Sequence, residues 1–142
     1  AHASPRLISD ILDHAARPMV ISHTGLKGAF NNERNISDAH AVKIAAQGGL
    51  IGIAYFPWAI GPCTVGSIVR TLLYAINLVG ADHVGLGSDW DRMVATPFDA
   101  SGMALITDAL LREGLSEEAI VKIMGGNAIR LLRETLPEQG PE

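Results

Sequence analysis

Short, continuous apolar runs alternate along the chain with longer segments of helical periodicity, and this alternation restricts the fold more than any other feature. The apolar runs are PMVIS (18–22), LIGIAYF (50–56) and the glycine-containing HVGLGSD (83–89). A solid apolar run is typical of a strand that is covered on both faces, as in parallel sheets. Consecutive parallel strands need a crossover of about a dozen residues or more, usually a helix. We therefore predict an α/β fold built from βαβ units.

The segments between these runs carry the start and stop signals of helices. Ser4 followed by Pro5 has the pattern of an N-cap with proline at the first helical position, and Ser37 and Ser116 are further N-cap candidates. The predicted helices cover residues 6–16, 38–47, 67–80, 102–114, 117–126 and 127–134. Such a chain can form an open doubly wound sheet or part of a (β/α)₈ barrel.

The length of the chain favours part of a barrel. A complete (β/α)₈ barrel takes about 250 residues, whereas this chain has 142. The sequence predicts three strands, with a fourth if another ends just before His2, which is about half of a TIM-type barrel. We expect residues 1–142 to form this half-barrel as a single segment. The 83–89 run lacks the G-x-G-x-x-G spacing of a dinucleotide site.

Composition excludes several classes of partner. The formal net charge is -4 and no block of like charge occurs, so we expect no nucleic acid to bind. The longest apolar stretch, LIGIAYFPWAI, is about half the length that crosses a bilayer and contains a proline, so no membrane segment is expected. The single cysteine, Cys63, fits a reducing compartment, and we predict a cytoplasmic location.

Several residues that could do chemistry follow the predicted strands. Ligand sites in parallel α/β folds gather at the carboxyl ends of the strands. His23 follows one apolar run, Asp89 follows another, and His2 would follow a strand upstream. Two neutral imidazoles can bind zinc, although a catalytic zinc usually has three protein ligands. Asp89 could carry a proton, and the planar fork of Arg34 could hold a carboxylate.

Each of these residues also has a structural explanation. A lone histidine at a strand end is more often hydrogen-bonded than a ligand, Asp89 and Asp91 could cap loop amides, and Arg34 could be an ordinary surface charge beside Glu33. The other histidines are explained more simply still. His14 lies late in a helix, where the macrodipole favours a positive charge, and His83 starts a strand at the end away from the chemistry. His40, in the first turn of a helix, is expected to face solvent.

The ordered set of motifs resembles the carboxy-terminal half of the membrane dipeptidase (renal dipeptidase, peptidase M19) family. The segments that carry the resemblance are HASPRLISDILDHAARPMVISHTG, ERNISD, GGLIGI, GADHVGLGSDWD and LREGLSEEAIVKIMGGNAIRLL. Together they cover nearly the whole chain. The most specific pieces are the paired histidines, the RN that ends the loop, the GLGSDxD and the late GGN.

The resemblance implies a zinc-dependent dipeptidase with a (β/α)₈ fold and two zinc ions. His2 and His23 match the two histidines that bind one of the zincs. Arg34 matches the arginine that receives the terminal carboxylate of the dipeptide, and Asp89 matches the aspartate that protonates the leaving nitrogen. The remaining ligands, a His-x-Asp pair and a bridging glutamate, should lie upstream of residue 1, so this chain holds at most one partial zinc site.

Two departures from the family pattern affect the expected site. Where many members have DFDG, this chain has Asp89-Trp90-Asp91-Arg92, and Ala54 stands where many have asparagine. A free half-barrel also exposes the edges of its sheet. We therefore expect the chain to pair with an amino-terminal half-barrel or to form a homodimer, and to be inactive alone. The alternatives are a non-catalytic binding or structural module and a metal-dependent amidohydrolase of another amide.

Overall fold

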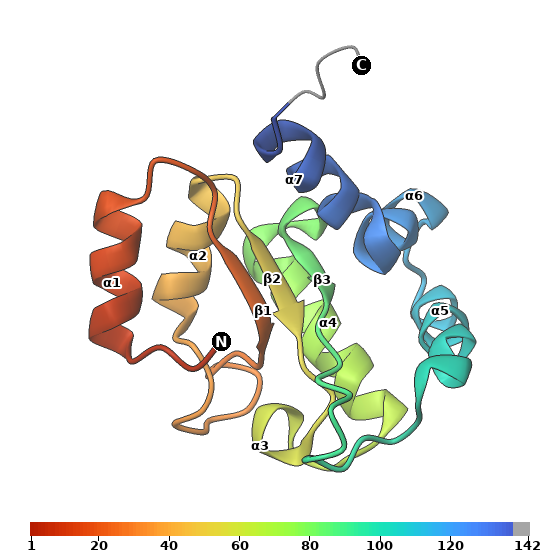
Figure 1. The fold of residues 1–142 in the computed structure, drawn as a ribbon. Coiled ribbons are helices and arrows are strands. Elements are labelled where there is room, and N and C mark those ends of the chain that lie inside the picture. The colour runs from red at the N-terminus through yellow and green to blue at the C-terminus, as the bar shows by residue number, and fades with distance from the viewer. Residues whose placement is uncertain (138–142) are drawn as a thin grey trace.

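A three-stranded parallel sheet lies at the centre of the computed structural model, which describes residues 1–137 (Figure 1). The strands β1 (Val20–Thr24), β2 (Leu50–Ile53) and β3 (Val84–Leu86) lie in the order β1-β2-β3. Ile51 of β2 pairs with Ile21 of β1 and with Val84 of β3. The predicted α/β fold with a parallel sheet is confirmed. Residues 138–142 of the expected single segment lie outside the described residues.

Helices that connect the strands cover one face of the sheet. α2 (Asp38–Ala46) and α4 (Val65–Val79) contact each other and pack against β2, and α1 (Pro5–His14) packs on α2. Figure 1 shows α5 (Met103–Arg112), α6 (Glu117–Val121) and α7 (Asn127–Thr135) on the β3 side. The short elements are α3 (Pro57–Ile60), the 3₁₀ turns η1 (Ala81–His83) and η2 (Ala100–Gly102), and the π-helical η3 (Lys122–Gly126).

The predicted helix starts are confirmed at three serines. The hydroxyls of Ser4, Ser37 and Ser116 each accept a hydrogen bond from a main-chain amide in the first turn of α1, α2 and α6. An N-cap hydrogen bond of this kind stabilises a helix by about 1 kcal/mol. The helices then bury one apolar stripe against the sheet. The fully buried members of that core include Ile44, Ile51, Ile53, Ile68 and Leu72.

The strand boundaries differ from the predicted ones. β1 begins at Val20 and continues to Thr24, so His23 lies inside the strand and not after it. The register between β1 and β2 shifts between Ile21 and Thr24, which turns this end of the strand. β2 ends at Ile53. The last three residues of the predicted run, 54–56, lead into helix α3, which was not predicted. Proline at the first position of α3 suits a helix start and ends the extended run.

The helix predicted for residues 117–126 is interrupted. α6 ends at Val121 and a π-helical turn follows, in which Gly125 has φ 154. A residue with a side chain rarely adopts this conformation, so glycine permits the break. The buried amide of Asn127 then donates to the carbonyl oxygens of Ala81 (2.6 Å) and Val84 (2.8 Å). Asn127, from the GGN motif, therefore fixes the start of α7 to the start of β3.

The prediction that His40 faces solvent is wrong. His40 is half-buried, and its two ring nitrogens lie 3.0 Å from the hydroxyl of Ser9 and 2.9 Å from that of Ser37. The packing of α1 on α2 brings Ser9 to the ring, which the sequence of α2 alone does not reveal. His14 and His83 also have partners in the main chain. The Nδ1 atom of His14 lies near the carbonyl oxygen of Asp10, and that of His83 lies near the carbonyl oxygen of Gly49.

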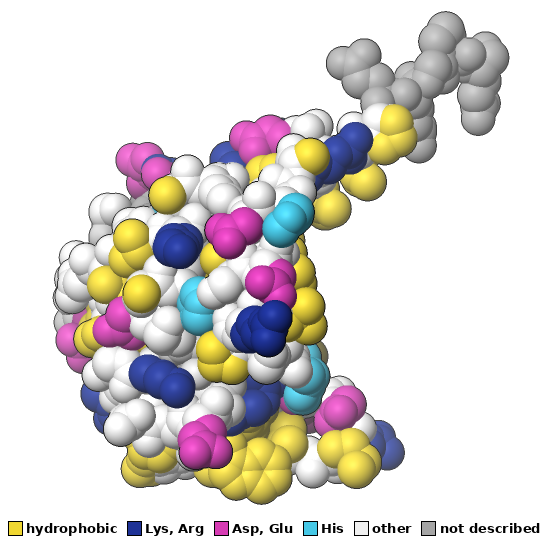
Figure 2. Space-filling model, turned by 90° about the vertical axis from the view of Figure 1, so that its left-hand side faces the viewer, with side chains coloured by type: hydrophobic (Ala, Val, Ile, Leu, Met, Phe, Trp, Pro, Cys, Tyr) yellow, Lys and Arg dark blue, Asp and Glu magenta, His cyan; other side chains and the backbone are white. Residues whose placement is uncertain are grey.

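The face of the sheet opposite α2 and α4 is covered only in part, because η3 and α7 contact β3 while Val20 of β1 is exposed. Residues of all three strands and of η3 line a cavity of about 260 Å³, among them Val20, Leu50, Gly85, Leu86 and Met124. Figure 2 shows the molecule hollowed in profile, and shows acidic and basic side chains interspersed over the side that faces the viewer. Within residues 1–137, no helix combines the length and the apolar character needed to cross a membrane.

Candidate metal and substrate site

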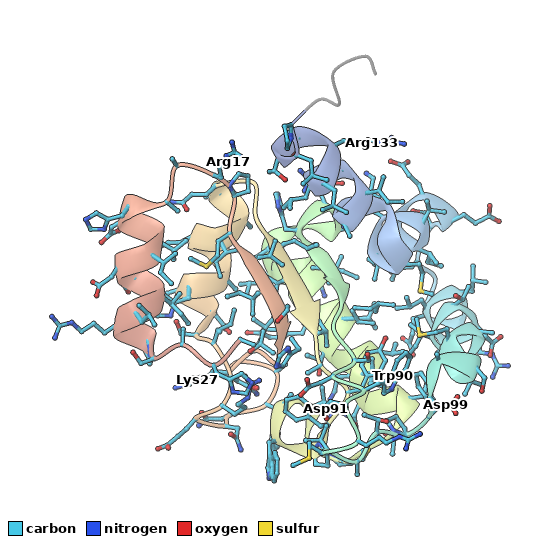
Figure 3. The ribbon with its side chains drawn as sticks, in the orientation of Figure 1. Arg17, Lys27, Trp90, Asp91, Asp99 and Arg133 are labelled. Atoms are coloured by element: carbon cyan, nitrogen blue, oxygen red, sulfur yellow. The ribbon has the colours of Figure 1, made fainter. Side chains whose placement is uncertain are left out.

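His2, His23 and Asp89 lie together at the carboxyl end of the sheet. Figure 1 shows the N-terminus beside the carboxyl end of β1, which places His2 next to His23. Asp89 belongs to the loop that follows β3, and Figure 3 shows its neighbours Trp90 and Asp91 at this same end of the molecule. Three chain segments that are far apart in the sequence therefore supply one cluster.

The two imidazoles face each other through their Nε2 atoms. These nitrogens lie 3.2 Å apart, with the ring planes at 65°. Two ligands on one tetrahedral zinc, each about 2.0–2.1 Å from the metal, are separated by about 3.3 Å. The pair therefore has the donor atoms and the spacing that one zinc ion requires. Within residues 1–137, no group of three or more His, Cys, Asp or Glu side chains could hold a metal ion. The described residues therefore offer two facing imidazole donors and no third ligand beside them.

His23 is held in a form that can bind a cation. Its Nδ1 lies 3.0 Å from the hydroxyl of Ser22, which leaves Nε2 directed at His2. Burial lowers the pKa of His23, and nearby Asp89 opposes that shift while Arg34 and His2 add to it. A lowered pKa keeps the imidazole neutral near pH 7, and neutral imidazole is the form that binds metals. Ser22 is a partner that the sequence did not single out.

Asp89 stands 3.6 Å from His23, measured from Oδ1 to Nε2, and 21% of its side chain is exposed. Its backbone has φ 63, a left-handed conformation that is uncommon for a residue other than glycine. Strained conformations of this kind gather at functional sites. The neighbouring carboxylate behaves differently, because Asp91 accepts a hydrogen bond from the amide of Met93. The loop-capping explanation therefore fits Asp91, and Asp89 is the carboxylate that faces the histidines.

Arg34 is not an ordinary surface charge. Its guanidinium donates to the carbonyl oxygens of Ala1 (3.3 Å) and His23 (3.5 Å), and its Cζ lies 5.3 Å from the centre of the Phe56 ring. Burial lowers the pKa of Arg34 and Asp89 opposes the shift, but an arginine stays charged at any physiological pH. The structure therefore places a half-buried cation beside the histidine pair.

Phe56 connects these groups. Its ring lies under Arg34 and 6.4 Å from the ring of His23, in an edge-to-face arrangement. Phe56 follows β2, and its ring forms one wall of the site. A second aromatic group anchors the Asp89 loop, because the Trp90 indole donates to the carbonyl oxygen of Phe98 and packs against Tyr55. The charged groups of the site are thus held by aromatic side chains.

The comparisons with known proteins identify the family. The profile of the membrane dipeptidases (Peptidase family M19) matches residues 1–139. The chain belongs to this family. The resemblance seen in the sequence motifs is therefore confirmed.

Two curated relatives show how much of a membrane dipeptidase this chain represents. Dipeptidase tcpJ of Claviceps purpurea is 35% identical over 141 residues, which are 94% of this chain and 33% of that protein. Dipeptidase ataJ of Aspergillus terreus is 31% identical over 142 residues, which are 94% of this chain and 35% of that protein. The chain spans about a third of the length of these relatives.

Solved structures of membrane dipeptidase type share the fold. The probable dipeptidase PvdM from Pseudomonas aeruginosa superposes with a TM-score of 0.84 at 20% identity, covering 90% of this chain and 47% of that one. A metallo peptidase from Rhodobacter sphaeroides, liganded with a phosphinate mimic of the dipeptide L-Ala-D-Ala, gives 0.83 at 24% identity, covering 91% and 39%. At these identities the similarity concerns the fold.

Proposed function

We propose that this chain is the carboxy-terminal half-barrel of a zinc-dependent dipeptidase, with its substrate-facing groups gathered at the carboxyl ends of the strands. The observation that carries the proposal is the convergence of two facing imidazoles, a carboxylate and a half-buried guanidinium on one site. The family membership and the sequential order of the parallel strands support it.

Each group has a separate role in the proposed reaction. His2 and His23 would hold zinc through their Nε2 atoms, and zinc held there would supply the Lewis acid that polarises a peptide carbonyl. Arg34 receives the free carboxylate of the dipeptide, because its planar fork forms paired, charge-assisted hydrogen bonds. Asp89, 3.6 Å from His23, would take a proton from the water that attacks the peptide carbonyl and pass it to the leaving nitrogen as the C–N bond breaks. The four residues thus bind, orient and protonate the substrate.

The other ligands come from a second polypeptide segment. The described residues offer two imidazole donors and no third ligand beside them, and the partly covered sheet face exposes Val20, of which 46% is accessible. An amino-terminal half-barrel would cover that face and supply the missing ligands, and a homodimer is the second arrangement that would cover it. Chromatography with light scattering of the chain alone checks this, because a stable monomer would contradict both arrangements.

The roles of His23 and Arg34 separate in the complete protein. His23→Ala should remove zinc and abolish dipeptide hydrolysis. Arg34→Ala should keep zinc and raise KM by about 10- to 100-fold, since hydrogen bonds to a charged group contribute about 1.5–3 kcal/mol and each 1.4 kcal/mol is tenfold. His14 is an exposed histidine of α1, so His14→Ala is the matched control and should change neither the zinc content nor KM.

The same experiment decides between the alternatives. Zinc content is measured by mass spectrometry, and hydrolysis by release of free amino acids from Ala-Ala-type dipeptides. Equal loss of zinc in the His23 and Arg34 variants would refute the separate roles. Cleavage of N-acyl amino acids in place of dipeptides would favour the other amidohydrolase, and a complete protein that binds zinc but cleaves neither would favour a binding module. The isolated chain should bind zinc weakly and show no turnover.

A further inference from the structure

The loop that carries Arg34, residues 25–36, is held in place by side chains that take no part in the chemistry. It leaves β1 directly after Thr24 and ends where Ser37 caps α2. A parallel bridge between Leu26 and Ile36 closes its base, and both side chains are buried. The question is what fixes the remainder of this Arg34 loop, because an unrestrained loop would not keep a guanidinium in one place.

The buried amide of Asn35 joins two parts of the Arg34 loop to each other and ties the loop to α3. Only 4% of Asn35 is exposed. Its Oδ1 accepts from the amide of Gly25 (3.0 Å), and its Nδ2 donates to the carbonyl oxygens of Phe30 (2.8 Å) and Ala59 (2.9 Å). A Cβ on Gly25 would lie 2.6 Å from the Asn35 Oδ1, so the fit depends on glycine there. Both donor hydrogens of the amide are therefore used inside the protein.

Asp38 holds the other side of the Arg34 loop. Its Oδ1 accepts from the amide of Gly28 (3.1 Å), and its Oδ2 accepts from the Tyr74 hydroxyl (2.5 Å). The second hydrogen bond raises the pKa of Tyr74. A Cβ on Gly28 would overlap the Tyr74 hydroxyl, so the loop and α4 are in close contact. Asp38 thus links the loop to a helix that belongs to the core.

These contacts fix the position of the guanidinium relative to its ring. Asn35 is bonded to Ala59 in α3, and the residue that caps the start of α3 is Phe56. Arg34 precedes Asn35 and lies with its Cζ 5.3 Å from the centre of the Phe56 ring. The side-chain amide of Asn35 therefore sets the distance between the Arg34 loop and the ring of Phe56.

We propose that Asn35 and Asp38 are positioning residues of the carboxylate subsite, which hold Arg34 over Phe56 and beside His23 before the substrate binds. The inference rests on the proposed function, because it assumes that Arg34 receives the carboxylate. A preorganised loop avoids the entropy cost of ordering on binding, so loosening it weakens substrate binding. The hydrogen bonds of the Asp38 side chain are with Gly28 and Tyr74 and not with His2 or His23, so we expect its removal to leave zinc binding unchanged.

Asp38→Ala in the complete protein tests the proposal, because this half-buried side chain can be removed with less risk to folding than Asn35. We expect KM for a dipeptide to rise about tenfold with zinc content unchanged. The inhibition constant of acetohydroxamic acid, which binds zinc and has no carboxylate, should stay within about twofold. A loss of affinity for both ligands would show general damage to the site and would overturn the proposal.

Two further variants separate positioning from other effects. Asp38→Asn keeps the oxygen that accepts from Gly28 and should restore KM to within about threefold of the parent. Asp38→Ala combined with Arg34→Ala should raise KM no further than Arg34→Ala does, since coupled residues are not additive. Additive effects would overturn the inference. If Arg34→Ala raises KM and Asp38→Ala does not, the inference fails alone. If Arg34→Ala leaves KM unchanged, the proposed function of Arg34 fails.

Discussion

Replacing Gly87 by alanine should damage the fold and the histidine pair together. Gly87 follows β3, and its amide still donates to the carbonyl oxygen of Ile53. A Cβ there would lie 2.9 Å from the Cα of His23, and closer still to the carbonyl oxygen of Ser22. Carbon atoms normally approach to about 3.5–4.0 Å, so relieving the His23 contact alone needs a shift of about 0.6 Å, and the closer Ser22 oxygen requires β1 to move further still. Overpacking costs about 1–3 kcal/mol, and the upper end applies because main-chain atoms cannot rotate aside.

Gly85→Ala, two residues earlier and inside β3, is the matched control. A Cβ on Gly85 would lie 3.4 Å from Leu50 Cδ1, which is a side-chain atom that can adjust. Its free energy of unfolding should therefore change by less than about 1 kcal/mol. Urea denaturation of the complete protein measures both variants, and zinc titration reports the displacement of His23. If the two variants unfold at the same urea concentration and bind zinc equally, the close approach of Gly87 to β1 is not a constraint and the reasoning is refuted.

Three smaller perturbations probe other parts of the chain. Tyr55→Phe should leave the free energy of unfolding unchanged or raise it by about 1 kcal/mol, because the buried Tyr55 hydroxyl has the weak acceptor Met103 Sδ at 3.9 Å; a loss of stability in urea denaturation would contradict this. Asn127→Ala should destabilise by about 2–3 kcal/mol, since two carbonyl oxygens lose their donor, and thermal unfolding measures the change. The hydrogen bond from Lys122 lowers the pKa of Asp82. This pair therefore stabilises the fold above the unfolded pKa of about 3.9, and its contribution is lost as the pH falls below that value. In Asp82→Asn, the free energy of unfolding should depend less on pH between about pH 5 and pH 3, as measured by urea denaturation.

The parts of the fold that were predicted correctly depend on local chemistry. The N-caps at Ser4, Ser37 and Ser116 are recognisable because a serine hydroxyl directly before a helical segment can accept a hydrogen bond from an amide of the first turn. The parallel strands are recognisable because a run covered on both faces must be apolar throughout. The boundaries of β2 were missed for the same reason, since a buried turn into α3 is as apolar as the strand before it.

In the candidate site, too, the residues were predictable where the signal is local in the sequence. His23 and Asp89 could be chosen from the sequence because a polar residue that interrupts an apolar run is easily seen. The supporting contacts could not, because they join residues distant in the chain. The bond from Asn35 to Ala59 spans 24 positions, and that from Tyr74 to Asp38 spans 36. These contacts become visible only when α3 and α4 pack against the Arg34 loop and the start of α2.

The loop after β3 shows how a departure from the family pattern can be read physically. Arg92 stands where many family members have glycine, and its φ is 70, in the left-handed region that glycine favours. A left-handed conformation costs about 1–2 kcal/mol for a residue with a side chain. Asp89 in the same loop also has positive φ, so the strain is concentrated beside the histidine pair. Trp90 lies between these two residues in the chain, and its contacts with Phe98 and Tyr55 fix this part of the loop against its surroundings.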